Sequence, residues 1–202
     1  MIHEFGFGTE KQQIEIPEKN LYRELLANDN IAFSPEDADI RYSLEHPVNS
    51  KRLKDIIKPG EKIAIITSDI TRPMPTYKVM PELLAELQAG GADFKDITLV
   101  FALGSHRKQT EEEKKKLAGE FAYQRINTVD SDPDDCIHMG VTANGTPVDI
   151  TRVVAEADRR IALGNIEFHY FAGYSGGVKA IMPGVSTPAA IQSNHKLMIR
   201  PE

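Results

Sequence analysis

The stretch EKIAIITSD, residues 61–69, decides the fold class of this chain. Its core is an unbroken apolar run rich in β-branched residues, which is typical of a strand buried on both faces of a parallel sheet. The runs DITLVFALG at 96–104 and RRIALGN at 159–165 have the same character. The shorter and more polar QRINTVD, residues 124–130, adds a further strand.

Segments with helical character separate these strands. Residues 76–92 predict a helix closed by glycine in spite of the internal Pro81, and residues 110–123 predict a second helix. Residues 146–165 read as strand, helix and strand, and residues 188–202 as a final helix. Alternating strands and helices with short connections favour an α/β fold, with a mostly parallel Rossmann-like sheet covered by helices on both faces.

The first 60 residues have a different pattern. Residues 2–17 alternate apolar and polar side chains around a Gly-Thr-Glu-Lys turn, which predicts a β-hairpin. Residues 34–47 predict a helix with Ser34 as its N-cap, and residues 49–60 a second short helix ended by Pro-Gly. We therefore expect residues 1–60 to form an extension packed on an α/β cofactor-binding domain, residues 61–202.

Composition narrows the function classes. The net charge of −6 over 202 residues provides no basic patch for nucleic acid or an anionic membrane. No apolar run approaches the ~20 residues that span a bilayer, and the polar start does not resemble a signal peptide. Cys136 is the single cysteine, which excludes an internal disulfide and suits a reducing compartment. We expect a soluble, cytoplasmic protein.

The residues that could carry chemistry follow the predicted strands. In open α/β sheets, ligands bind beyond the carboxyl ends of the strands. These candidate residues are Asp69, Thr71 and Arg72 after the first strand, His106 and Arg107 after the second, Glu167, His169 and Lys179 after the fourth, and His195 in the last helix. Each has an ordinary alternative: Asp69 and Thr71 could cap a helix, and a single histidine often has no role.

The segment GYSGGVKAIMPG, residues 173–184, is the most informative. Its closely spaced glycines can present backbone N–H groups to a phosphate, although the Walker A and GxGxxG spacings are absent. Apolar neighbours of Lys179 favour a lowered pKa of its amine and hence a nucleophile. From the residues alone, Lys179 is a phosphate-binding or Schiff-base lysine.

Four motifs, in order, resemble those of the nickel-dependent lactate racemase family. They are SDITRPMP at 68–75, LGSHR at 103–107, GNIEFHYFAGYSGGVKAIMPGV at 164–185 and the Asn-His pair of SNHKL at 193–197. The resemblance covers residues 60–198 in motifs and corresponds to the N-terminal domain of that family. It implies an isomerase that racemises or epimerises a 2-hydroxy acid.

The resemblance also implies a cofactor and its protein ligands. Family members hold a nickel pincer pyridinium mononucleotide, joined through a thioamide bond to the lysine that matches Lys179. The metal is held by two sulfurs, a ring carbon and one histidine, matched here by His195. Such a soft, flat donor set suits Ni(II). Tyr174, Ser175, Gly176 and Gly177 of the same loop are the remaining cofactor-binding candidates.

Catalytic and substrate-binding roles follow from the same resemblance. His106 and His169 match the acid/base pair, and Arg72 matches the arginine that grips the substrate carboxylate. Asp69 orients a histidine or Arg72. The implied reaction is reversible removal of hydride from a 2-hydroxy acid through a planar 2-keto intermediate.

Family enzymes are about twice this length, and their C-terminal domain closes over the site. We therefore expect these 202 residues alone to be inactive or nearly so. The identity of the 2-hydroxy acid and the oligomeric state, with a homo-oligomer as one option, stay open.

Two other readings compete with a racemase. A non-catalytic nucleotide- or phosphate-binding domain would use the GYSGG segment and need neither His106 nor His195. A hydrolase could pair His169 with Ser175, but the segment lacks the GxSxG spacing of such enzymes.

Overall fold

The computed structural model describes residues 1–25, 36–72, 74–170 and 172–199. They form two compact units, Met1–Ser34 and Pro35–Glu202. The first unit contains the hairpin of strands β1 (Ile2–Phe7) and β2 (Glu10–Glu15), which pair antiparallel. The predicted hairpin is thus confirmed. A short 3-10 turn, η1 (Glu18–Asn20), follows it, and the predicted cap Ser34 lies outside the described residues.

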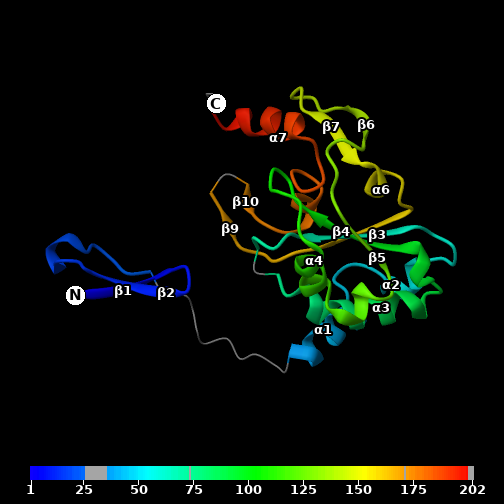
Figure 1. Ribbon diagram of the computed structural model, residues 1–202, viewed down its shortest axis with the longest axis horizontal. Helices are drawn as coiled ribbons and strands as arrows, with labels where there is room; N and C mark the ends of the chain where they lie inside the picture. Colours follow the sequence, from blue (N-terminus) through cyan, green and yellow to red (C-terminus); the bar gives the residue numbers. More distant parts are fainter. Residues whose placement is uncertain (26–35, 73, 171, 200–202) are drawn as a thin grey trace. The chain divides into compact units, whose positions relative to one another are not determined.

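The second unit is built on a four-stranded parallel sheet (Figure 1). Its strands are β3 (Ile63–Ser68), β4 (Ile97–Ala102), β5 (Asn127–Asp130) and β8 (Arg159–Leu163), in the order β5-β4-β3-β8. The chain therefore adds β4 and β5 on one side of β3 and then places β8 on its other side. Beyond the carboxyl ends of β3 and β8 the connections diverge, which is where open α/β sheets bind ligands. The predicted α/β class is confirmed.

Helices cover one face of this sheet (Figure 1). They are α1 (Glu36–Glu45), α2 (Leu53–Ile56), α3 (Thr76–Ala89), α4 (Glu111–Ala118) and α5 (Glu120–Tyr123). Ile65, Leu99 and Phe101 point to this side and pack with buried residues of α3 such as Leu84. Since these side chains are almost fully buried, the apolar strand runs stabilise the sheet by removing their surface from water.

The opposite face has a smaller core. Ala64, Ile66 and Val100 pack there with Val154 of α6 (Arg152–Ala155) and with Val185. Strand β7 (Pro147–Thr151) also lies on this side, paired antiparallel with β6 (Cys136–Val141). The alternation of strand residues between two cores explains why the strand runs read as continuously apolar.

Some local predictions were wrong. The helix expected at 110–123 is divided at Gly119, whose φ of 76° no helix accommodates. The strand expected near 147–151 exists but pairs with β6 outside the main sheet. The short strands β9 (Phe168–His169) and β10 (Gly173–Tyr174) were not expected, nor was β6.

The predicted last helix is confirmed as α7 (Pro188–His195), which begins at the side-chain cap of Thr187 and is continued by the 3-10 turn η4 (Lys196–Ile199). Among the described residues, no helix is long and apolar enough to span a bilayer.

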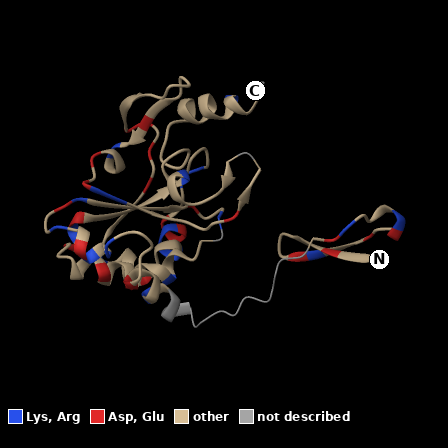
Figure 2. Cartoon of the chain, turned by 180° about the vertical axis from the view of Figure 1, so that it is seen from behind, with Lys and Arg blue, Asp and Glu red and all other residues tan. Residues whose placement is uncertain are grey.

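Acidic and basic residues are interspersed along the helical layer (Figure 2). Arg52 pairs with Glu86 at 2.7 Å, and Arg159 pairs with Glu61 at 2.8 Å. The hydrogen bonds from Arg159 lower the pKa of Glu61 to about 2. Both of these arginines are therefore neutralised by a neighbouring carboxylate.

Candidate functional site

A cavity of about 450 Å³ opens beyond the carboxyl ends of β3, β4 and β8. Small-molecule sites usually have volumes of roughly 300–1,000 Å³, so this cavity has the size of a small-molecule site. The predicted site residues that line it are Asp69, Arg72, His106, His169, Ser175, Gly176, Lys179 and His195. Tyr174 and Gly177 are absent from its lining. The loops that follow the strands, together with α7, thus bring into one cavity side chains that are separated by more than a hundred positions in the sequence.

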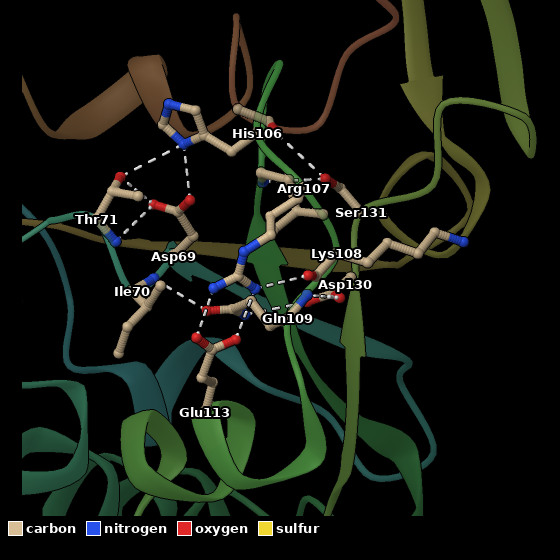
Figure 3. A network of polar contacts seen from close by, with 12 residues as sticks. Asp69, Ile70, Thr71, His106, Arg107, Lys108, Gln109, Glu113, Asp130 and Ser131 are labelled. Atoms are coloured by element: carbon tan, nitrogen blue, oxygen red, sulfur yellow. Dashed lines mark hydrogen bonds and ion pairs between the residues drawn. The ribbon is translucent and has the colours of Figure 1, made fainter.

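The Asp69 carboxylate and the His106 imidazole form the best-defined pair of the site (Figure 3). His106 Nδ1 lies 2.7 Å from Asp69 Oδ2, while Thr71 donates its hydroxyl to Asp69 Oδ1 at 2.7 Å. The Asp69 residue is only 3% exposed. A carboxylate so placed holds the proton of a neutral imidazole on Nδ1, which leaves Nε2 as the basic nitrogen.

Neither Asp69 nor Thr71 caps the following helix. The N-cap of α3 is Pro75, which provides no side-chain hydrogen bond, and Asp69 instead closes a turn with the backbone N–H of Thr71 at 3.3 Å. The helix-cap alternative for these residues is therefore wrong. Their side chains bond to each other instead, and that of Asp69 also contacts His106.

Glycines allow the segment after β8 to pack closely. Gly176 has a φ of 80°, and a Cβ there would lie 3.0 Å from the carbonyl oxygen of Asn165. A Cβ on Gly184 would overlap the carbonyl oxygen of Ala180. Only glycine fits at these two positions, which explains the glycine-rich sequence in structural terms.

The Ser175 hydroxyl is committed to the same turn. It donates to the carbonyl oxygen of Asn165 at 2.8 Å and accepts from the backbone N–H of Glu167 at 3.0 Å. Both contacts are to backbone groups, and none is to His169. The arrangement of a serine nucleophile and its base is not formed between these two residues.

Positive charges gather on the Lys179 side of the cavity. Burial and the nearby Arg72 guanidinium lower the pKa of Lys179, and the Glu167 carboxylate opposes them. Burial, Lys179 and Arg72 likewise lower the pKa of His169. Both shifts enlarge the neutral fraction of a base near pH 7, as an amine nucleophile and a proton acceptor require.

Two of the three histidines that line the cavity, His169 and His106, have different hydrogen-bond partners. His169 Nδ1 accepts from the backbone N–H of Ala172 at 3.3 Å, so its neutral ring carries the proton on Nε2. His106, in contrast, faces a carboxylate through Nδ1. One ring therefore offers a bare nitrogen and the other an N–H group.

One cavity histidine is a candidate for holding a metal. Among the residues that the structure describes, no group of three or more His, Cys, Asp or Glu could hold a metal ion. His195 of α7 is the predicted metal ligand, and it lines the same cavity as Lys179. The imidazole of His195, the amine of Lys179 and the glycine turn at Gly176 therefore face one space.

Comparison with known proteins identifies the family. The family model described as the lactate racemase N-terminal domain matches residues 7–202. This chain belongs to that family. It is 33% identical over 198 residues to the lactate racemase of Thermoanaerobacterium thermosaccharolyticum, and 35% identical over 163 residues to that of Lactiplantibacillus plantarum. These alignments cover 95% and 79% of the chain.

Solved structures agree with the family assignment. The lactate racemase apoprotein of T. thermosaccharolyticum superposes with a TM-score of 0.85 at 31% identity, covering the whole of this chain and 48% of that one. A protein from Thermotoga maritima superposes with a TM-score of 0.64 at 21% identity over 87% of this chain and 43% of that one, which shows a shared fold. The chain spans 46% and 38% of the lengths of the two lactate racemases above.

Proposed function

We propose that this chain is the cofactor-holding domain of a 2-hydroxy-acid racemase or epimerase, an isomerase that uses a nickel pincer pyridinium mononucleotide. The observation that carries the proposal is the single cavity lined by Lys179, His195 and the His106–Asp69 pair. These residues match the family's motifs one by one. The fold brings them to one place from three strand ends and α7.

Lys179 and His195 are the residues that would hold the cofactor. The lowered pKa of Lys179 leaves more of its amine neutral, as formation of a thioamide bond to the cofactor requires. His195 would supply the protein ligand to nickel, and Tyr174, Ser175, Gly176 and Gly177, from the loop that precedes Lys179, are the other residues proposed to bind the cofactor. When bound, the cofactor supplies reversible acceptance of hydride from the substrate carbon.

The side chains of this domain would handle the substrate's proton and its carboxylate. Arg72, an exposed guanidinium at the cavity, suits bidentate binding of a 2-hydroxy acid's carboxylate. His106 Nε2 would take the hydroxyl proton, because Asp69 holds the other nitrogen and stabilises the imidazolium that forms. His169 would serve the opposite stereoisomer, since an inverting reaction needs a base on each face. To accept a proton there, its ring would have to release the Ala172 N–H and carry its proton on Nδ1, which leaves Nε2 bare.

Residues outside this chain complete the proposed enzyme. The His106 side chain is 42% exposed and Arg72 is also exposed, whereas catalytic sites exclude water during reaction. We propose that the second half of the full-length relatives covers this cavity, and that the 202 residues alone do not turn over substrate. A cytoplasmic location and the division into an extension, 1–60, and a cofactor-binding domain, 61–202, belong to the same proposal.

Intact-mass analysis of protein made in cofactor-producing cells tests this function. We expect an added mass that peptide mapping assigns to Lys179, together with bound nickel. His195→Ala should retain the added mass and lose most of the nickel, while His138→Ala, outside the cavity, should retain both. An unmodified Lys179 in protein from cells that load a known lactate racemase would contradict the proposal.

The second candidate is a non-catalytic nucleotide- or phosphate-binding domain. The turn at Gly176 and Gly177, both with positive φ, favours it because such turns present backbone N–H groups to anions. It predicts reversible nucleotide binding without nickel. Substituting His106 or His195 by alanine would then leave the affinity unchanged.

A further inference from the structure

A buried glutamine lies behind the site without lining the cavity. Gln109 is 8% exposed and belongs to the connection between β4 and α4. Its amide oxygen accepts the backbone N–H of Ile70 at 2.9 Å, and its amide nitrogen donates to Asp130 Oδ1 at 3.0 Å. Its own backbone N–H donates to Asp130 Oδ2 at 2.9 Å. The orientation of the amide is fixed, because Ile70 can only donate and the Asp130 carboxylate only accept.

The contact with the Ile70 N–H holds the turn that carries Asp69. Ile70 separates Asp69, which bonds to His106, from Thr71, which bonds to Asp69 (Figure 3). Gln109 itself lies three residues after His106. One side chain therefore links the turn that carries the carboxylate to the loop that carries the imidazole.

The end of β5 anchors this link. Asp130 is the last residue of β5 and holds Gln109 at two points. The next residue, Ser131, accepts the backbone N–H of Leu103 at the start of the His106 loop, at 3.1 Å. No residue of β5 is among those that line the cavity. A strand remote from the ligand space thus supports both ends of the loop.

We propose that Gln109 and Asp130 are positioning residues that keep Asp69 aligned with His106 Nδ1 and so fix the His106 tautomer. The effect of this alignment on catalysis rests on the proposed racemase function, whereas the alignment itself does not. Without the Gln109 contact, the Ile70 N–H loses its buried acceptor and the turn 69–71 must shift to find another. The His106 ring would then sample both neutral tautomers.

The tautomer can be measured directly in this chain by nitrogen NMR of ¹⁵N-histidine-labelled protein. Unaltered protein should show a protonated Nδ1 and a bare Nε2 for neutral His106. Gln109→Ala and Asp130→Asn should move both nitrogen shifts toward averaged values, while Gln88→Ala, an exposed glutamine of α3, should not. Unchanged His106 shifts in both variants would overturn the proposal.

A double variant in which the amide and the carboxylate exchange places, Gln109→Glu with Asp130→Asn, is called the inverted pair. It distinguishes a positioning role from a packing role. Gln109→Glu alone sets two carboxylates against each other, and Asp130→Asn alone removes an acceptor. When the two substitutions are combined, the introduced carboxylate could accept from both the Ile70 N–H and the new asparagine amide. The oxygen of that amide could still accept the backbone N–H of residue 109. The double variant should recover the tautomer signature that each single variant loses, and a failure to recover it would contradict the proposed role.

Turnover of the loaded, full-length enzyme gives the catalytic readout. We expect Gln109→Ala to lower kcat about tenfold to a hundredfold, with a smaller change in KM and recovery in the inverted pair. Unchanged kcat in an active enzyme would overturn the catalytic consequence. If the unaltered protein has no racemase activity, the proposed function fails, but the NMR result still decides the positioning role.

Discussion

The two walls of the cavity are built on different principles. On the β3–β4 side, side chains are held by hydrogen bonds, from Asp130 through Gln109 to the Asp69 turn and His106. On the side of residues 164–184, glycines set the backbone, while burial and neighbouring charges set the state of Lys179 and His169. The first wall fixes geometry and the second tunes protonation.

The walls meet at Gly184. Its carbonyl oxygen accepts the backbone N–H of Gly104 at 2.8 Å and the Ser131 hydroxyl at 3.4 Å. A Cβ on Gly184 would clash with the Ala180 carbonyl oxygen and with the Ala102 side chain. Substitutions in the hydrogen-bonded wall should therefore change alignment and those in residues 164–184 charge state, with Gly184 as the joint. Arg72, which follows β3, is the exception, because its charge acts on Lys179 and His169.

The largest effect should come from the charge-tuned wall. Lys179→Arg retains the positive charge but cannot form the proposed covalent bond to the cofactor. Racemase activity of the full-length enzyme should fall to background, on the order of 10⁶-fold or more, because the cofactor carries the chemistry. Activity assays with intact-mass analysis measure this, and Lys116→Arg on the exposed face of α4 is the matched control. Retained activity and added mass in Lys179→Arg would show that another residue carries the cofactor.

Asp69→Asn tests the hydrogen-bonded wall. An asparagine cannot stabilise the His106 imidazolium and can donate toward Nδ1, which favours the wrong tautomer. We expect kcat to fall about 10²–10⁴-fold while folding is retained. Steady-state kinetics beside Asp134→Asn, an exposed carboxylate, check this. A loss confined to KM would point to substrate binding instead of proton transfer.

Gly184→Ala tests the joint. The added methyl group would overlap the Ala180 carbonyl oxygen and the Ala102 side chain, so the two walls must separate or strain. The free energy of unfolding should drop by about 1–3 kcal/mol, as for other overpacked sites. Urea denaturation measures it, with Gly6→Ala as control because a Cβ there meets nothing within 4 Å. Equal stabilities would mean that the backbone at Gly184 relaxes freely.

The smallest effect concerns charge coupling at Arg72. Because Arg72 lowers the pKa of both Lys179 and His169, Arg72→Gln should raise both. At a fixed pH near 8, a smaller fraction of the Lys179 amine would be neutral, so amine-reactive reagents should label it more slowly. NMR titration of His169 and labelling rates of Lys179 follow this, with Arg125→Gln on the helical layer as control. A fall in either pKa would contradict the assigned direction.

Much of the architecture could be predicted because its signals are local. The β-branched runs of β3 and β4 predict buried strands. The rule that ligands bind beyond the carboxyl ends of the strands selects Asp69, His106 and Lys179, which do line one cavity. The break of the helix at Gly119 was missed, although a glycine with positive φ is a common helix end. A Cβ there would lie 2.9 Å from the Tyr77 side chain, a contact that the local sequence does not reveal. The pairing of β6 with β7 was missed as well, since none of the residues of β6 is fully buried and its sequence lacks an apolar run.

Gln109 shows most clearly what local patterns lack. In the sequence it is one polar residue in a polar loop, and nothing in its neighbours marks it as buried. Its role depends on Ile70 and Asp130, each more than twenty positions away.

The sequence by itself determined the α/β layering, the strand ends that carry polar residues and the identity of the motif residues, because hydrophobic periodicity and side-chain chemistry are written along the chain. Only the tertiary structure decided which of those residues share a cavity, which nitrogen of each histidine is bare, and why the amine of Lys179 loses its proton more readily. Those properties arise from hydrogen bonds, burial and charge between segments distant in sequence, and such contacts exist only after the sheet has formed.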